Sequence, residues 1–169
     1  MSISKKKTIV AVIGGHKCSN EVEEIAMKLG KLLAKVGVTL VCGGLNGVMK
    51  AVSRGMQEGG GVTVGILPGE NKQDANPYVD IPIPTGLGYT RNTLVAGCAD
   101  IIIALAGEYG TLSEIAFALN MKKPVIGIGS WDIKGMRQVN TPEEAVALVK
   151  TIVNDTKGTG PFVSLRGDE

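Results

Sequence analysis

Short apolar runs alternate along most of the chain with longer segments in which apolar residues recur every three or four positions. The runs predict buried β-strands, and the three- or four-residue spacing predicts amphipathic α-helices. Strands are expected over residues 8–13, 38–42, 62–67, 100–105 and 124–128. Helices are expected over residues 20–36, 47–58, 90–99 and 111–121. A last helix is expected from residue 141, where a capping box and a proline mark its start.

The repeated order of strand and helix predicts a parallel sheet with helices on both of its faces. We therefore expect an α/β fold with a Rossmann-like doubly wound parallel sheet. A chain of 169 residues fits a single domain, residues 1–169, with frayed tails at residues 1–7 and about 156–169. Residues 68–89 are rich in glycine, proline, asparagine and aspartate, which predicts a long loop with room for a short strand. Such a loop is a candidate lid or oligomer contact.

Composition and charge argue against several classes of function. The apolar runs are interrupted before they reach the roughly 18 residues that a membrane span needs, so no membrane segment is expected. The formal net charge is only +2, and the basic start Lys5-Lys6-Lys7 contains no aromatic residue, so nucleic acid is not an expected partner.

The cysteines also indicate a location. They are scattered and follow no secretory segment, which predicts a reducing cytoplasm without disulfides: Cys18, Cys42 and Cys98. His16 and Cys18 have no further metal ligands near them in the sequence, so no metal site is expected.

Glycine clusters where the predicted strands end. The glycines concerned are Gly14, Gly15, Gly43, Gly44, Gly107 and Gly110. Because the carboxyl ends of parallel strands share one edge of the sheet, we expect these turns to lie on the same rim. Glycine turns allow a ligand to approach the backbone closely, and amide groups at a following helix start attract an anion. The turns therefore predict a ligand that bears phosphate and ribose-like groups.

The stretch from Ala106 to Glu114 is the most informative of these turns, because it joins a predicted strand to a predicted helix. Thr111 supplies a hydroxyl and Glu114 a carboxylate at the expected start of the helix. Two interpretations stay open. The two groups serve a phosphate site, or they form a capping box that satisfies the amides of the first helical turn and has no other role.

The kind of nucleotide chemistry is narrowed by motifs that the sequence lacks. The first turn, from Ile13 to Cys18, is not the spaced glycine fingerprint of a dinucleotide dehydrogenase, and no acidic residue ends the second strand. The chain also contains no Walker loop, which argues against a kinase or ATPase. A ligand resembling a mononucleotide is therefore favoured.

Several runs resemble the LONELY GUY superfamily of Rossmann-like proteins, which was long labelled lysine decarboxylase-like. They are residues 42–52, residues 59–68, Arg91, Asp100 and Tyr109-Gly110-Thr111. The resemblance covers roughly residues 8–128. The superfamily includes two kinds of protein. Phosphoribohydrolases cleave the bond between base and ribose in nucleoside 5′-monophosphates such as cytokinin precursors, and carrier proteins hold the molybdenum cofactor. No lysine lies in a context that suggests a pyridoxal Schiff base.

The match to the hydrolase pattern is partial. Positions that match its phosphate loop and preceding arginine are Gly107, Tyr109, Gly110, Thr111, Glu114 and Arg91. Positions that depart are Ala106 for proline, Glu108 for glycine, Ser113 for glutamate and Asn92 for lysine. The departures and the overall length resemble the carrier branch more than the hydrolases.

These residues lead to two hypotheses. The first is a carrier that binds a phosphorylated nucleotide or a molybdopterin-type cofactor. The alternative is a phosphoribohydrolase in which Glu114 supplies the carboxylate and Arg91 orients it or holds the ligand. Arg91 can equally be a surface arginine or part of an interface ion pair. Glu108 would repel an anion unless its side chain points away or pairs with a cation such as Lys17 or Arg91.

The resemblance also implies a homo-oligomer, a dimer or a tetramer. The sequence adds only that apolar residues of the long loop can either seal a symmetric interface or belong to the core: Val79, Ile81 and Ile83.

Overall fold

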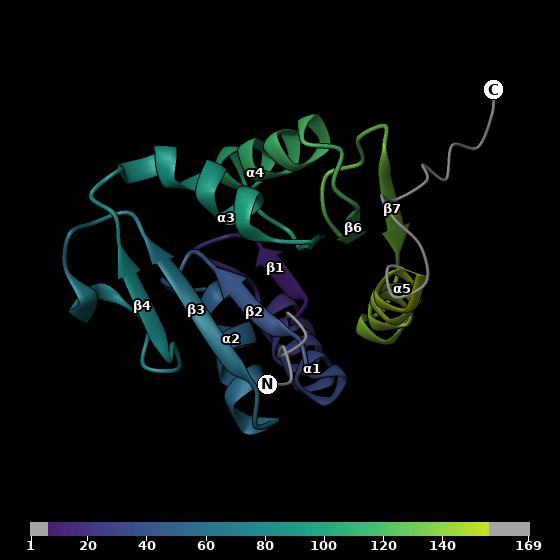
Figure 1. The fold of residues 1–169 in the computed structure, drawn as a ribbon, viewed down its shortest axis with the longest axis horizontal. Coiled ribbons are helices and arrows are strands. Elements are labelled where there is room, and N and C mark those ends of the chain that lie inside the picture. Colours follow the sequence, from purple (N-terminus) through teal and green to yellow (C-terminus); the bar gives the residue numbers. More distant parts are fainter. Residues whose placement is uncertain (1–6, 156–169) are drawn as a thin grey trace, which may run out of the picture.

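The computed structural model describes residues 7–155 (Figure 1). Its helices are α1 (Asn20–Val36), α2 (Val48–Glu58), α3 (Asn92–Cys98), α4 (Tyr109–Asn120) and α5 (Pro142–Asp155). Its strands are β1 (Ile9–Ile13), β2 (Thr39–Cys42), β3 (Val62–Leu67), β4 (Ile81–Pro84), β5 (Ile101–Ala104), β6 (Val125–Ile128) and β7 (Met136–Val139). The 3₁₀ turns η1 (Lys72–Asp74) and η2 (Gly88–Arg91) flank β4 in the chain. Except for Lys7, the predicted tails lie outside the described residues.

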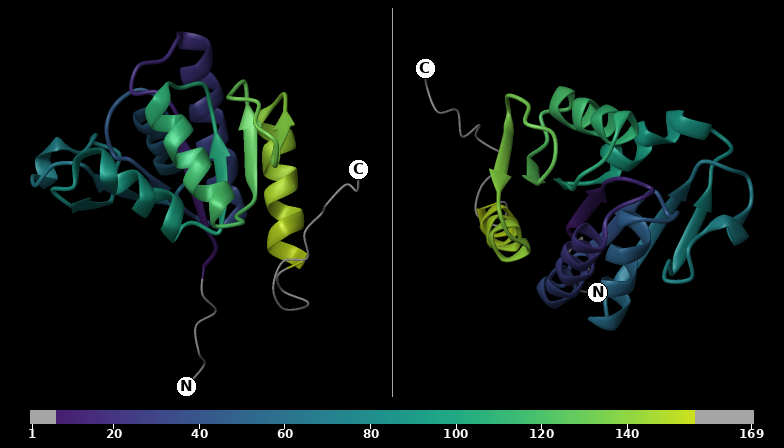
Figure 2. Two further views of the ribbon diagram at one scale, coloured as in Figure 1. Left: turned by 90° about the horizontal axis from the view of Figure 1, so that it is seen from above. Right: turned by 180° about the vertical axis from the view of Figure 1, so that it is seen from behind.

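Within the described residues the strands form one sheet in the order β4-β3-β2-β1-β5-β6-β7, and all neighbouring pairs are parallel. The chain builds the sheet outward from β1 to β4 and then returns to the other side of β1 with β5. Helices α1, α2 and α5 cover one face, and α3 and α4 cover the other (Figure 2). The predicted Rossmann-like doubly wound fold is confirmed. Its strand order reverses between β1 and β5, the place where such sheets bind ligands.

Most predicted elements are present with small changes at their ends. Helix α4 begins at Tyr109, two residues before the expected start, and Thr90 belongs to η2 instead of α3. The long loop contains the short strand β4. The sequence did not predict β7, because its exposed Arg137 and Gln138 interrupt the apolar pattern of a strand.

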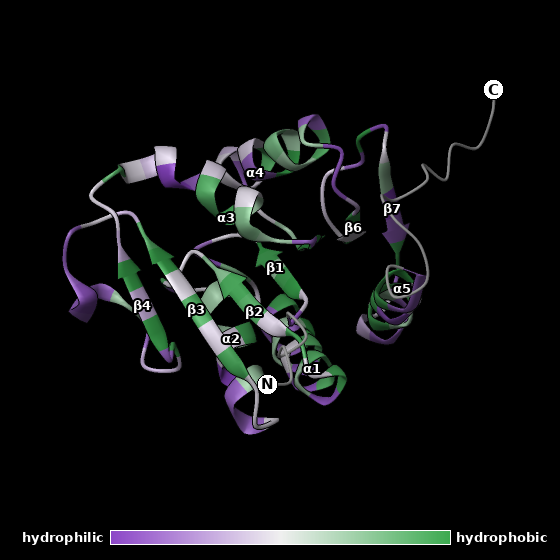
Figure 3. Ribbon diagram, in the orientation of Figure 1, coloured by the Kyte–Doolittle hydropathy of each residue, from purple (hydrophilic) through white to green (hydrophobic). Residues whose placement is uncertain are grey.

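The central strands are buried on both faces. Ile101 and Ile103 of β5 pack with α1, α2 and α5, whereas Ile102 between them packs with α3 and α4. This double burial explains why the strands appear as continuous apolar runs, which Figure 3 shows in green. Burying each such side chain stabilises the fold by about 1.5–3 kcal/mol.

No described helix combines the length and apolar character needed to cross a bilayer.

Strand β4 forms one edge of the sheet and carries two prolines. The Thr85 N–H donates to the Leu67 carbonyl at 3.2 Å, so alternate residues of β4 direct their backbone groups toward β3. Pro82 and Pro84 occupy the other set of positions, where the nitrogen faces the open edge. A proline is tolerated there because no ladder hydrogen bond is lost.

Helices α1 and α2 cross at a contact between their backbones. A Cβ added at Gly30 would overlap the Val52 carbonyl, and one added at Gly55 would overlap the carbonyl of Met27. Only glycine fits at such a crossing. The contact fixes α2 against α1 and thereby fixes the end of α2 that begins at the rim.

Replacing Gly55 with alanine should lower the free energy of unfolding by about 1–3 kcal/mol, because the added methyl group forces α1 and α2 apart. Gly97 on α3 is the matched control, since a Cβ there meets no atom within 4 Å. Gly97→Ala should be neutral or stabilise the protein by up to ~1 kcal/mol. Urea unfolding of the parent and both variants measures these effects, and equal stabilities of the two variants would contradict the close contact.

Candidate functional site

The glycine turns that end β1, β2 and β5 meet at one rim of the sheet. The Gly15 N–H donates to the carbonyl of Ala106 at 2.8 Å, and the Gly15 carbonyl accepts the Val48 N–H at 3.0 Å. A Cβ added at Gly107 would overlap the Thr111 hydroxyl. The turn after β1 is therefore hydrogen-bonded to the turn after β5 and to the start of α2, as the sequence led us to expect.

Helices α2 and α4 begin at this rim without a side-chain cap. Their N-cap residues, Gly47 and Glu108, make no side-chain hydrogen bond to the first turn. By contrast, Ser19 accepts an amide of α1 at 3.3 Å, and Thr141 accepts one of α5 at 3.2 Å. Uncapped N-termini carry unpaired amides and a partial positive charge, so the starts of α2 and α4 favour an anion.

The capping-box interpretation of Thr111 and Glu114 is wrong. Because α4 begins at Tyr109, Thr111 lies inside its first turn and is not the N-cap residue. The helix begins earlier than expected because the Glu108 carbonyl accepts the Leu112 N–H at 3.0 Å. Both Thr111 and Glu114 are buried.

Arg91 and Glu114 form a buried pair beneath the rim. The Arg91 Nη1 lies 3.8 Å from the Glu114 Oε1, and Nη2 donates to the Gly43 carbonyl at 3.3 Å. The Nε of Arg91 has no hydrogen-bond partner among the described residues. Arg91 is 8% exposed, so it is not the surface arginine that the sequence left open. The pair connects η2, α4 and the turn after β2.

Burial controls the ionisation of this pair. It raises the pKa of Glu114 from 4.5 to about 8, and the charge of Arg91 opposes that rise only in part. Burial likewise lowers the pKa of Arg91, and Glu114 opposes this shift. Near neutral pH the Glu114 carboxyl is therefore mostly protonated, and the guanidinium of Arg91 keeps an incompletely balanced charge.

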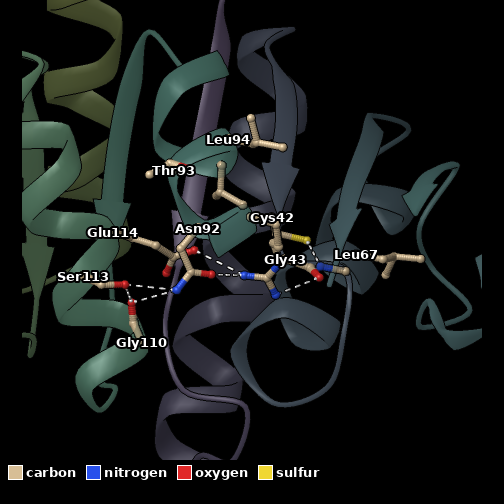
Figure 4. A network of polar contacts seen from close by, with 12 residues as sticks. Cys42, Gly43, Leu67, Asn92, Thr93, Leu94, Gly110, Ser113 and Glu114 are labelled. Carbon is tan, nitrogen blue, oxygen red and sulfur yellow. Dashed lines mark hydrogen bonds and ion pairs between the residues drawn. The ribbon is translucent and has the colours of Figure 1, made fainter. Parts of the chain in front are cut away.

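Asn92 and Ser113, both departures from the hydrolase pattern, are in direct contact. The Asn92 amide donates to the Ser113 Oγ at 3.0 Å and to the Gly110 carbonyl at 3.4 Å (Figure 4). The Ser113 hydroxyl donates to the same carbonyl at 2.7 Å, and Asn92 Oδ1 accepts a hydrogen bond from Arg91. This contact was not predicted, because nothing in the sequence relates two residues so far apart.

Glu108 is accommodated without strain or an ion pair. Its φ of −93° suits any residue, so the glycine of the hydrolase pattern is not required here. The side chain is exposed, and among the described residues it pairs with neither Lys17 nor Arg91. The cation that we considered for it, Arg91, is paired with Glu114 instead.

Trp131 lies on the other side of the Gly107 turn, in the loop after β6. Its indole N–H donates to the Gly107 carbonyl at 2.9 Å. The ring centroids of Trp131 and Tyr109 are 6.3 Å apart, with their planes tilted by 32°. This contact was not predicted, because Trp131 belongs to no recognisable sequence motif.

Other features lie away from the rim. A cavity of about 500 Å³ lies at the end of the sheet opposite the rim, where β1, β5 and β6 begin. Its lining includes Lys7, Asp100 and Lys123. Asp100 accepts the Ile9 N–H there at 2.8 Å, and Lys123 donates to the Ala99 carbonyl at 2.6 Å, so both groups hold elements together. Among the described residues, no group of three or more histidine, cysteine or acidic side chains is placed to hold a metal ion.

Several known proteins are similar to this chain. The molybdenum cofactor binding protein of the phototrophic bacterium Rippkaea orientalis superposes with a TM-score of 0.84 at 36% identity, covering 89% of this chain and 99% of that one. The molybdenum cofactor carrier protein of Chlamydomonas reinhardtii superposes with a TM-score of 0.81 at 33% identity, covering 88% and 99%.

A hydrolase is also similar. The cytokinin riboside 5′-monophosphate phosphoribohydrolase LOG of Oryza sativa subsp. japonica is 33% identical over 121 residues, 66% of this chain and 49% of that protein. The chain thus spans about half of the hydrolase but nearly all of each carrier.

The predicted resemblance to LONELY GUY proteins and molybdenum cofactor carriers is confirmed by these similarities. The SLOG cluster4 family model matches residues 7–155, which is every residue that the structure describes. The chain therefore belongs to the SLOG cluster4 family.

Proposed function

We propose that this chain is a cytoplasmic binding or carrier protein for a phosphorylated nucleotide or a molybdopterin-type cofactor. The ligand would lie at the rim, its phosphate near the turns that contain Gly15, Gly44, Gly107 and Gly110. The contact between Asn92 and Ser113 carries this proposal. Similarity to molybdenum cofactor binding proteins over nearly their whole length supports it.

Asn92 and Ser113 are neutral residues at two positions where the hydrolase pattern has charged ones. The hydrolase pattern has lysine and glutamate, two oppositely charged residues, at these two positions, whose side chains here lie 3.0 Å apart. In this chain the same place holds a neutral hydrogen bond. Ser113 has no carboxylate to offer, and Asn92 adds no positive charge beside Arg91.

The remaining acidic residue is poorly suited to cleaving the base–ribose bond. That cleavage passes through a cationic ribosyl transition state, which a carboxylate stabilises by its negative charge. Glu114 is buried, and its pKa of about 8 keeps it mostly neutral near pH 7. The neutral carboxyl leaves Arg91 available to an anionic ligand, so the pair favours binding over hydrolysis.

One observation favours the hydrolase alternative. Arg91 and Glu114, the two residues that match the hydrolase pattern, remain in contact at 3.8 Å. A glutamate with a raised pKa is also the usual form of a general acid near neutral pH. In this alternative Glu114 protonates the leaving base instead of stabilising the ribosyl cation.

Incubation with AMP, GMP and CMP tests the two functions directly. We expect chromatography to detect no free base. We expect calorimetry to show that the protein binds a nucleotide or purified molybdenum cofactor. Arg91→Gln should weaken binding of that ligand about 10- to 100-fold, because a charge-assisted hydrogen bond to the anion is lost. Arg137→Gln, which changes an exposed arginine of β7, is the matched control. Release of free base that stops in Glu114→Gln would establish the hydrolase instead.

The pKa of Glu114 also predicts how stability depends on pH. The unfolded chain releases this proton near 4.5, whereas the folded protein keeps it up to about 8. Between these values the folded state binds more protons, so its stability falls as pH rises through this window. Glu114→Gln cannot titrate and should lose less stability over the same range. Urea midpoints of both proteins between pH 4.5 and 8 measure the difference, and parallel curves would contradict the shifted pKa.

We further propose that the protein is a homo-oligomer that associates through α3 and α4. Among the described residues, neither helix exposes a charged side chain, and both carry exposed apolar ones: Leu94, Phe117 and, directly after α4, Met121. Figure 3 shows these helices mainly in green and pale tones, while purple marks parts of α1 and α5. An uncharged apolar helix pair is typical of a subunit interface.

The apolar residues of the long loop extend the same face of the sheet. Ile81 and Ile83 pair in register with Val64 and Ile66, whose side chains lie on the side of α3 and α4. The interpretation of Ile81 and Ile83 as core is wrong, because their side chains are 50% and 44% exposed. They remain candidates for the subunit contact.

Leu94→Asp should convert the protein to a smaller species, because a carboxylate would be buried at the contact. Ala147→Asp on the exposed side of α5 is the control and should leave the assembly unchanged. Size-exclusion chromatography with light scattering measures both variants. A parent protein that is monomeric at high concentration would rule out the proposed interface.

A further inference from the structure

Tyr109 and Trp131 stand together on the side of the Gly107 turn that faces β6. Arg91 reaches the Gly43 carbonyl at the end of β2, whereas Trp131 follows the end of β6. Across the sheet these positions lie on opposite sides of β1 and β5. The rim therefore has a charged end at Arg91 and an aromatic end at Trp131, with the Gly107 turn between them.

The indole of Trp131 is held in place by neighbouring elements. Its N–H is bonded to the Gly107 carbonyl at 2.9 Å, and its own carbonyl accepts the side-chain amide of Gln138 at 2.8 Å. Gln138 in turn packs directly over Gly127 of β6, where a Cβ would overlap it. The ring is thus fixed relative to the turn at which a phosphate is proposed to bind.

The fold does not require the Tyr109 ring. Its side chain is 80% exposed at the first position of α4, so it contributes little buried area. Its ring lies 6.3 Å from that of Trp131 at a tilt of 32°, which is neither a parallel stack nor a perpendicular contact. An exposed aromatic ring beside a fixed indole offers an apolar ring face to solvent at the rim.

We propose that Tyr109 and Trp131 form a platform on which the planar heterocycle of the bound ligand stacks. This inference rests on the proposed function, because it assigns the ring of the same phosphorylated ligand. The ligand class is then a phosphate ester joined to a flat heterocycle, a purine or a pterin. Aromatic side chains recognise such rings through their faces and tolerate different ring types.

The platform also bears on the choice between carrier and hydrolase. A heterocycle on the β6 side of the turn is directed away from the Arg91 end of the rim. A hydrolase instead needs the bond between ring and sugar beside the acid that cleaves it. We infer that stacking on Tyr109 and Trp131 draws the ring toward β6 and away from the contact of Arg91 at the end of β2, which favours binding over cleavage.

The test uses ligands that differ in the heterocycle. Trp131 is the only tryptophan of the chain, so the protein's tryptophan fluorescence reports on this ring alone. AMP or neopterin monophosphate should quench the fluorescence, and ribose 5-phosphate should bind by calorimetry without quenching. Tyr109→Ala should weaken binding of the ring-bearing ligand about 5- to 100-fold and leave the affinity for ribose 5-phosphate unchanged. The control Tyr89→Ala removes a similarly exposed tyrosine and should leave the affinity for both kinds of ligand unchanged.

A second variant separates stacking from support of the loop. Trp131→Phe keeps an aromatic face but loses the N–H bond to Gly107, so it should retain more affinity for the ring-bearing ligand than Trp131→Leu does. Equal binding of AMP and ribose 5-phosphate in the parent and in Tyr109→Ala would overturn the platform and leave the proposed function intact. Failure of the parent to bind these three ligands and purified molybdenum cofactor would overturn both.

Discussion

Direct backbone contact between turns is the constraint on which this molecule depends. The amide and carbonyl of Gly15 bond to the turn after β5 and to the start of α2, and Gly107 leaves no room for a side chain. Glycine is needed here because the chains approach within hydrogen-bond distance. With the turns locked together, the starts of α2 and α4 point their unpaired amides at the same rim. The proposed ligand site is thus a by-product of how the strand ends are joined.

Beneath the rim, a buried charge is left partly unbalanced. Burying an arginine normally requires an ionised partner and full hydrogen bonding. Arg91 instead faces a carboxyl that burial keeps mostly protonated, and its Nε has no partner among the described residues. Such an arrangement costs stability in the free protein. The proposed anionic ligand would complete the balance, and binding sites commonly differ from the rest of a fold in this way.

The sequence predicted the fold well because the sheet is buried on both faces. Continuous apolar runs and glycine stops marked the five inner strands, whereas the edge strands β4, with its two prolines, and β7, with its exposed Arg137, gave no such pattern. Candidate site residues could be named from the sequence, but their geometry could not. The contact of Asn92 with Ser113 and that of Trp131 with Gly107 depend on tertiary packing, which spacing along the chain does not encode. The burial of Glu114 was hidden in the same way, because a carboxylate at a helix start ordinarily faces water.

The prolines of β4 have a consequence for how the molecule can polymerise. An open parallel sheet has two exposed edges, and each is a template on which another strand can add without limit. Pro82 and Pro84 remove donors from one of these edges, and the exposed Arg137 and Gln138 of β7 place polar side chains along the other. Edge-to-edge growth into fibres is thereby disfavoured. The proposed association is left to the helical faces, where a self-complementary contact would close after two copies.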